Sequence, residues 1–215
     1  MEPDAVEIRV LGCLIEKQRT TPDAYPLSLN ALRLACNQST NRDPVADYDE
    51  EAVSAALRRT AQRGWTRLAS GAGSRARKYR HLLTEALGLV VAEVSLLAVL
   101  MLRGAQTPGE LKQRSERLHG FESLVAVEEA LEGLIERGWV RREERRPGQK
   151  EGRYSQLLGG GEAGEEVTAS AVPPADLSAA EVEIETADPD RLDRLETELL
   201  ALRDEVTKLR DALGG

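Results

Sequence analysis

The sequence predicts a mainly α-helical fold with small β-hairpins, an α+β class, in which one structural unit occurs twice. Three observations predict it: an internal repeat, two short strands around a basic loop in each copy, and a leucine heptad pattern near the C-terminus. Three helices followed by a hairpin form the element order of a winged helix-turn-helix, so we expect two such domains in tandem. The alternative is two small α+β units of a general kind. The expected divisions are a first winged-helix domain at 1–84, a second at 85–158, a flexible acidic linker at 159–187 and a coiled-coil helix at 188–213.

The internal repeat appears when each residue is placed beside the residue 74 positions later. Each copy then shows a helix with an apolar stripe at i, i+4 and i+8, a glycine that ends it, and a strand that opens with tryptophan. Upstream, Thr21 matches Thr107 at an offset of 86, so the first copy carries 12 extra residues. The matched positions are Val53, Leu57, Ala61, Arg63, Gly64 and Trp65 in the first copy and Val127, Leu131, Ile135, Arg137, Gly138 and Trp139 in the second.

An apolar helix is expected at the start of each copy, at Val6–Lys17 and Val91–Arg103. The second helix lies in an apolar run of 17 residues that contains one glutamate. A bilayer span needs about 20 apolar residues, so we expect a buried helix rather than a membrane span. In the second copy a capping box at Thr107–Glu110 starts the next helix, which turns Leu111 and Leu118 inward.

A basic loop separates the two strands of each copy, at 70–78 and 145–153, and the second strands are expected at Tyr79–Leu83 and Tyr154–Leu158. Residues 71–76 also match the dinucleotide-binding pattern G-x-G-x-x-G/A. That pattern requires a following helix, whereas a strand-like basic segment follows here. We therefore interpret these glycines as the tip of a hairpin.

The composition argues against several kinds of site. Seven aromatic residues and two histidines leave little for a base-stacking platform or a histidine-rich metal site. Cys13 and Cys36 predict neither a zinc ligand set nor a disulfide framework. Because common catalytic motifs are missing and His81 and His119 are expected at surface or boundary positions, we expect no enzyme, no cofactor and no metal. The start of the chain lacks a signal-peptide pattern, so we expect a cytoplasmic protein.

The net charge of −8 belongs to the C-terminal tail. Residues 1–83 carry a net charge of +3, residues 84–158 carry −1 and residues 159–215 carry −10. The acidic overall balance therefore neither favours nor excludes nucleic-acid binding by the first 158 residues.

Several runs of residues resemble the YceH family of bacterial proteins. They are Leu11–Asn30, Ala35–Gln38, Asn41–Val45 and Leu102–Leu111, and the resemblance extends over residues 5–158. The resemblance implies a tandem winged-helix fold, in agreement with the repeat. It implies no catalytic or binding residues, because the family has no established activity.

The third helix of a winged helix-turn-helix enters the major groove of DNA, so its outward face tests for nucleic-acid binding. In the first copy this face is polar and partly basic, and the following hairpin adds cations that reach phosphates. Asp49, Glu50 and Glu51 at the start of the helix argue against base readout, although such acids also cap helices and favour the helix dipole. The alternative for the basic hairpin is a solvated loop tip that does not contact nucleic acid. The candidate nucleic-acid-binding residues are Arg58, Arg59, Gln62, Arg75, Arg77, Lys78 and Arg80.

The equivalent face of the second copy carries Glu129, Glu132 and Glu136, which would repel a phosphate-lined groove. Two functional hypotheses follow. The first is a non-enzymatic, DNA-associated protein, such as a transcriptional regulator, that holds the phosphate backbone mainly through its first domain. The alternative is a protein–protein interaction module that does not bind DNA, and the acidic face of the second domain favours it there.

The polar loop Asn37–Pro44 is a second candidate site, with Asn37, Asn41 and Arg42 as its residues. Eight residues are long for a connector in a small domain, which favours a functional role. The alternative is a connector between two helices that is stabilised by Asx turns.

The tail combines a tether with a helix. Gly, Ala, Glu, Ser and Pro dominate 159–187, which predicts flexibility. Asp188 and Pro189 then start a helix with a heptad pattern, whose charged flanking pairs are attractive in a parallel dimer. We expect a weak parallel homodimer, and the alternative is a helix folded back onto the winged domains. The dimerisation positions are Leu192, Leu195, Leu199, Leu202, Val206, Leu209 and Leu213.

Overall fold

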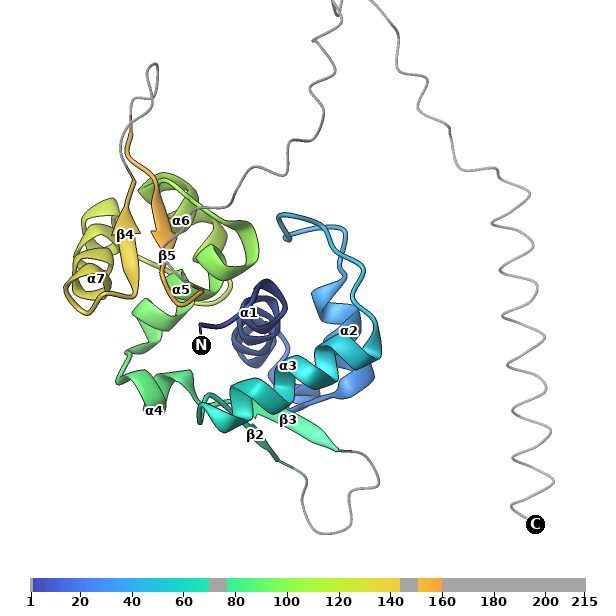
Figure 1. Cartoon of the computed structure of the whole chain (residues 1–215). Helices are drawn as coiled ribbons and strands as arrows, with labels where there is room; N and C mark the ends of the chain where they lie inside the picture. The colour runs from blue at the N-terminus through green and yellow to red at the C-terminus, as the bar shows by residue number, and fades with distance from the viewer. Residues whose placement is uncertain (1, 70–76, 144–150, 160–215) are drawn as a thin grey trace, which may run out of the picture. The chain divides into compact units, whose positions relative to one another are not determined.

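The computed structural model describes residues 2–69, 77–143 and 151–159 (Figure 1). The described residues all belong to one compact unit. The predicted coiled-coil helix at 188–213 and, apart from Gly159, the predicted linker at 159–187 lie outside the described residues. The parallel homodimer therefore stays a prediction.

The described part of the chain is mainly helical with small antiparallel sheets, as predicted. The first copy contains α1 (Ala5–Thr20), β1 (Leu27–Ser28), α2 (Leu29–Cys36), α3 (Glu50–Gln62), β2 (Thr66–Leu68) and β3 (Lys78–His81). The second contains α5 (Val91–Arg103), α6 (Pro108–Ser115), α7 (Leu124–Glu136), β4 (Val140–Arg142) and β5 (Tyr154–Gln156). A 3-10 turn at Pro22–Ala24 and the short helix α4 (Leu83–Leu87) are additions that the sequence did not predict.

The spacing of equivalent helices confirms the repeat. The starts of α1 and α5 are 86 residues apart and those of α3 and α7 are 74 apart. The starts of α2 and α6 are 79 residues apart, so seven of the extra residues precede α2 and five follow it. Thr21 and Pro22 start the 3-10 turn, whereas α2 is capped by Ser28, whose Oγ accepts a hydrogen bond from the Ala31 N–H (3.3 Å).

A short antiparallel hairpin follows each tryptophan. In the first copy β3 is the central strand between β1 and β2, and Leu27 lies opposite Tyr79. In the second copy β4 pairs with β5, and an isolated bridge between Gln106 and Tyr154 takes the place of the β1–β3 pairing. The second strands are shorter than predicted, and α4 follows β3 directly.

Helix α1 lies between the rest of the first copy and the second copy, and it packs into both cores (Figure 1). Val10, Cys13 and Leu14 belong to a cluster with α2 and α3. Ile8, Leu11 and Ile15, on the other side of the helix, belong to a cluster with α5, α6 and α7. Burial of apolar side chains on both faces therefore joins the two copies into one unit.

The prediction that Val91–Arg103 is a buried helix is confirmed, since residues 93–102 of α5 are all buried. The helix is shorter than the apolar run because the start of that run belongs to α4, which is ended by Gly88 with a left-handed φ of 62°. Leu111 and Leu118 are also buried, as predicted. Across the described ranges, the helices are too short or too polar to cross a bilayer.

One ion pair occurs at the same place in each copy. Glu7 in the first turn of α1 pairs with Arg63 after α3 (3.4 Å), and Glu93 in the first turn of α5 pairs with Arg137 after α7. Both glutamates are buried, with 1% and 8% of their surface exposed. Each copy thus uses this pair to hold its first helix against the end of its third.

His81 on β3 is buried, so the prediction of a surface or boundary position is wrong for this residue. His119 is half-buried, as predicted. The Nε2 atom of His81 lies 2.6 Å from Gln18 Oε1, and the backbone N–H of His81 donates to the Tyr25 hydroxyl (2.8 Å). Burial lowers the pKa of the imidazole to about 4, because the charged form is disfavoured away from water.

We expect the titration of His81 to lower the free energy of unfolding by about 2 kcal/mol between pH 7 and pH 5. The folded pKa of about 4 lies below the ordinary value of 6.5, so the unfolded chain takes up the proton first as the pH falls through this window. Urea unfolding at a series of pH values measures the effect. His81→Phe should remove this part of the pH dependence and His119→Phe should keep it. A His81→Phe variant with the wild-type pH dependence would contradict the assignment.

Candidate nucleic-acid interface

A hollow of about 270 Å³ opens between α3 and the β2–β3 hairpin of the first copy, and we name it the α3–hairpin hollow. Three arginines line it from three segments: Arg58 from α3, Arg67 from β2 and Arg77 from the residue before β3. Leu68 and Tyr79 line its apolar part. No carboxylate belongs to the lining as far as the chain is described. The hollow therefore concentrates positive charge between a helix and a hairpin.

The helical period of α3 decides which of its side chains reach solvent. Val53 and Leu57 are buried, so the opposite face of the helix is the exposed one. Arg58 and Gln62 are exposed on it, where the sequence places them. The Arg58 guanidinium donates to Ser54 Oγ one turn earlier (3.1 Å). Arg58 lines the hollow, whereas Gln62 does not.

Strand pairing positions the basic residues of the hairpin. Arg67 lies opposite Arg80 in the β2–β3 ladder, beside the buried pair Thr66 and His81. Because successive side chains of a strand point to opposite faces, the two arginines lie on the face opposite Thr66 and His81. Arg80 is half-buried, and its Nε is buried without a hydrogen-bond partner in the described structure. Arg67 is not among the residues predicted from the sequence, although its alternation with Thr66 along the strand was a usable signal.

Two further predicted hairpin residues are exposed in the structure, namely Arg77 and Lys78. Arg77 lines the hollow and Lys78 starts β3. The third, Arg75, lies outside the described residues. The described cations of the hairpin therefore include three predicted residues and the additional Arg67.

Arg59 is engaged in an ion-pair cluster at the start of α1. Its Nε donates to Glu7 Oε2 (3.1 Å), its Nη2 donates to Asp4, and Arg63 reaches the same glutamate. The hydrogen bond to Glu7 raises the pKa of Arg59. The helical position of Arg59 suggested a nucleic-acid contact, but its guanidinium instead holds α3 to α1.

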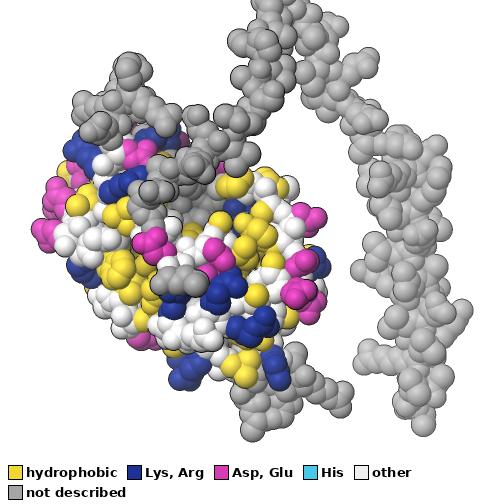
Figure 2. Space-filling view, in the orientation of Figure 1, with side chains coloured by type: hydrophobic (Ala, Val, Ile, Leu, Met, Phe, Trp, Pro, Cys, Tyr) yellow, Lys and Arg dark blue, Asp and Glu magenta, His cyan; other side chains and the backbone are white. Residues whose placement is uncertain are grey.

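Acidic residues lie at one end of the basic surface of the first copy. They also cover the equivalent helix of the second copy. Asp49 caps α3 by accepting from the Ala52 N–H (2.7 Å), and Glu50 and Glu51 are exposed in the first turn. Figure 2 shows Lys and Arg side chains over α3 and its hairpin, and Asp and Glu side chains over α7 at the left. The predicted acids of α7 are all exposed: Glu129, Glu132 and Glu136.

The polar loop between α2 and α3 is closed by two of its predicted residues. Asn37 Nδ2 donates to the Tyr48 carbonyl (2.8 Å), and Asn37 Oδ1 accepts from the Tyr48 N–H (2.9 Å). Arg42 is buried and donates to the carbonyls of Ala35 (3.0 Å) and Asn41 (2.8 Å). These contacts give Asn37 and Arg42 structural roles.

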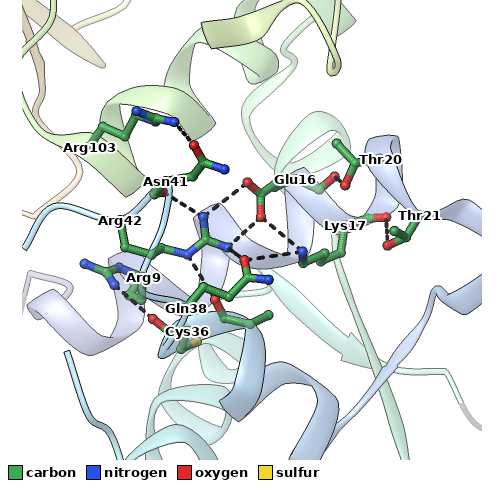
Figure 3. A network of polar contacts seen from close by, with 11 residues as sticks. Arg9, Glu16, Lys17, Thr20, Thr21, Cys36, Gln38, Asn41, Arg42 and Arg103 are labelled. Atoms are coloured by element: carbon green, nitrogen blue, oxygen red, sulfur yellow. Dashed lines mark hydrogen bonds and ion pairs between the residues drawn. The ribbon is translucent and has the colours of Figure 1, made fainter. Parts of the chain in front are cut away.

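Arg42 also joins the loop to α1 (Figure 3). Its two terminal nitrogens donate to both oxygens of Glu16 (3.1 and 2.6 Å), and one of them donates to Gln38 (2.8 Å). Burial lowers the pKa of Arg42, but the hydrogen bonds to Glu16 and nearby negative groups raise it overall. Asn41, with a left-handed φ of 61°, is exposed and accepts a hydrogen bond from Arg103 of α5.

No group of three or more His, Cys, Asp or Glu side chains is arranged to hold a metal ion in the ranges that the structure describes. Cys13 and Cys36 are buried free thiols of the first core. The candidate surfaces in the described ranges are therefore identified from their charge and shape.

Comparison with known proteins finds similarity along almost the whole chain. A family model described as "Protein of unknown function, DUF480" matches residues 4–149. A UPF0502 protein of Pelobacter propionicus is 48% identical over 209 residues, which cover 95% of this chain and 91% of the relative. A UPF0502 protein of Pseudomonas syringae pv. tomato is 42% identical over 209 residues (97% and 92%), and one of Cronobacter sakazakii is 41% identical over 217 residues (98% and 97%).

Proposed function

The chain belongs to the DUF480 family of bacterial proteins, in agreement with the resemblance drawn from its sequence, and we propose that it is a non-enzymatic protein that binds double-stranded DNA. In this proposal both copies are winged helix-turn-helix domains, and the first copy holds the phosphate backbone. The repeated order of three helices and a hairpin supports the fold assignment.

The α3–hairpin hollow carries the proposal. Arg58, Arg67 and Arg77 line it with no carboxylate among the described lining residues. Arginine binds phosphate oxygens through paired hydrogen bonds, and each neutralised phosphate releases condensed counterions. A helix with a hairpin beside it is also the arrangement with which winged helices contact a groove and the adjacent backbone.

The proposal is restricted to backbone contacts. In helix-turn-helix proteins the first turn of the third helix contacts base edges. Here that turn carries Glu50 and Glu51, which would meet the negative potential of the groove. We therefore expect little preference for base sequence.

Fluorescence anisotropy with a short random-sequence duplex tests this function. Wild-type affinity should fall steeply between about 50 and 200 mM salt, because the logarithmic slope is about −0.9 per phosphate held. The triple variant Arg58→Gln/Arg67→Gln/Arg77→Gln should bind much more weakly and flatten that slope by about 2 to 3 units.

The matched control removes three positive charges elsewhere, in the variant Lys17→Gln/Arg114→Gln/Arg117→Gln. This control should retain most of the wild-type affinity, since its residues lie outside the α3–hairpin hollow. Equal losses in the two variants would mean that net charge alone attracts DNA. Wild-type affinity in the first triple variant would exclude the proposed surface.

The second copy favours a different partner. The exposed face of α7 combines its glutamates with Val125, which is 60% exposed. Acidic and apolar side chains together suit a basic, amphipathic segment of another protein rather than DNA. Protein binding through this face becomes the better-supported function of the chain if the duplex fails to bind at low salt.

A further inference from the structure

A larger cleft, of about 580 Å³, lies between the two copies, and we name it the inter-copy cleft. Its walls come from the end of α1, the loop after α2, the end of α5, and α6 with the turn that follows it. Val99, Leu102 and Leu118 contribute apolar surface. The volume lies within the range of about 300–1,000 Å³ that is typical of small-molecule sites.

Positive charge dominates the lining of the inter-copy cleft. Among the described lining residues, the single carboxylate is Glu16. Both of its oxygens accept hydrogen bonds from the buried Arg42, and Lys17 lies 3.7 Å from one of them (Figure 3). Glu16 therefore compensates Arg42, which leaves the cations of the lining in excess. These cations are Lys17, Arg103, Arg114 and Arg117.

The helix end that faces the cleft is already capped. The last carbonyls of a helix carry partial negative charge, which attracts cations. At the end of α1, the Thr20 hydroxyl donates to the Glu16 carbonyl (2.9 Å) and the Thr21 hydroxyl donates to the Lys17 carbonyl (3.1 Å). The Lys17 carbonyl also accepts the Thr21 backbone N–H (3.0 Å), so these two carbonyls are fully occupied and do not compete for the cations of the cleft.

An acidic side chain beside the lining, that of Glu110, is shared between two arginines. Glu110 lies 3.5 Å from Arg114 and 3.1 Å from Arg153. Burial lowers the pKa of Arg103, the positive charges of Arg114 and Arg42 lower it further, and the carboxylates of Glu16 and Asp43 offset this only in part. The cations thus repel one another in part, and an added anion would relieve this repulsion.

We propose that the inter-copy cleft binds a small phosphorylated metabolite. Guanidinium groups pair with phosphate oxygens, and a tetrahedral phosphate offers oxygens in several directions. The cations of the lining come from three helices and a turn, which suits a tetrahedral group better than a planar carboxylate. The apolar surface of Leu102 and Leu118 can contact the organic part of the ligand. This site is separate from the α3–hairpin hollow and does not depend on DNA binding.

Isothermal titration of the full-length chain with inorganic pyrophosphate, at constant ionic strength, tests the site. One saturable site per chain is expected. The variant Arg103→Gln/Arg114→Gln should bind at least about tenfold more weakly per arginine, because a hydrogen bond to a charged group contributes on the order of a factor of ten. Citrate should bind more weakly than pyrophosphate, and equal or tighter citrate binding would overturn the phosphate assignment.

Two further variants separate this proposal from DNA binding and from misfolding. Arg58→Gln/Arg67→Gln removes the same charge outside the cleft and should leave the pyrophosphate affinity unchanged. Arg117→Gln removes an exposed cation without disturbing the contact between Arg103 and Asn41, and it should weaken binding in a chain of wild-type thermal stability. The absence of a saturable site, or wild-type affinity in both cleft variants, would overturn the proposal.

Discussion

Replacing Glu16 with alanine should lower the free energy of unfolding by about 3 to 5 kcal/mol, because it leaves a buried cation without its counter-charge. The side chain of Arg42 is fully buried and that of Glu16 is 13% exposed. The guanidinium would keep its bonds to the carbonyls of Ala35 and Asn41, but no carboxylate would compensate its charge. Urea unfolding followed by circular dichroism measures the loss.

Two variants define the origin of this loss. The double variant Glu16→Ala/Arg42→Met should recover part of the stability, since an apolar side chain of similar length replaces the uncompensated charge. Arg114→Gln breaks the partly exposed pair with Glu110 and should cost less than about 1 kcal/mol. A Glu16→Ala variant as stable as Arg114→Gln would show that Arg42 does not depend on its ion pair.

Gly12→Leu should cost about 3 kcal/mol or more, because α1 and α5 are too close for a side chain at this position. A Cβ atom at residue 12 would lie 2.9 Å from Leu102 Cγ and 3.1 Å from Met101 Cβ. The Met101 Cβ is fixed to the backbone of α5, so the two helices would have to separate. The separation would loosen the cluster that contains Leu11 and Ile15 as well as the packing of Leu102.

Gly109→Ala is the matched control for this variant. A Cβ atom at residue 109 in α6 would meet only Thr107 Oγ1, at 4.0 Å. The helix should therefore gain about 0.5 to 1 kcal/mol from the higher propensity of alanine. Thermal unfolding compares the two variants directly, and a Gly12→Leu chain with wild-type stability would mean that the helices are not in close contact.

The features that the sequence predicted well are local or periodic. The bounds of α5 and the start of α6 follow from apolar periodicity and from the capping box at Thr107, and they appear where expected. The offset of 74 residues placed α7 and the second hairpin from their first-copy equivalents. These features depend on residues close in sequence, so a pattern within a short window determines them.

The roles of individual side chains were harder to predict because their partners are distant in sequence. A helical projection places Arg59 on the outer face of α3, but it cannot show that Glu7, 52 residues earlier, is within reach. His81 is buried by contacts with Gln18 and Tyr25, which belong to α1 and the extra segment before α2. Tertiary contacts overrode the local pattern in both cases.

The inter-copy cleft could not be predicted from the sequence for the same reason. Its cations are up to 100 residues apart in the chain, from Lys17 to Arg117, and each one alone looks like an ordinary charge near a helix end. The polar loop was predicted as a candidate site. Of its three candidate residues, Asn37, Asn41 and Arg42, Asn41 is the one that lines the cleft. The packing of α1 against α5 brings these segments together.

The position of α1 in both cores limits how the protein can be dissected. A fragment that starts at residue 85 would lack Ile8, Leu11 and Ile15, and the apolar surface of α5 that they cover would meet water. Such surface promotes self-association. The two copies are therefore not interchangeable modules. A chimeric protein in which one copy is replaced must keep a first helix that packs into both cores.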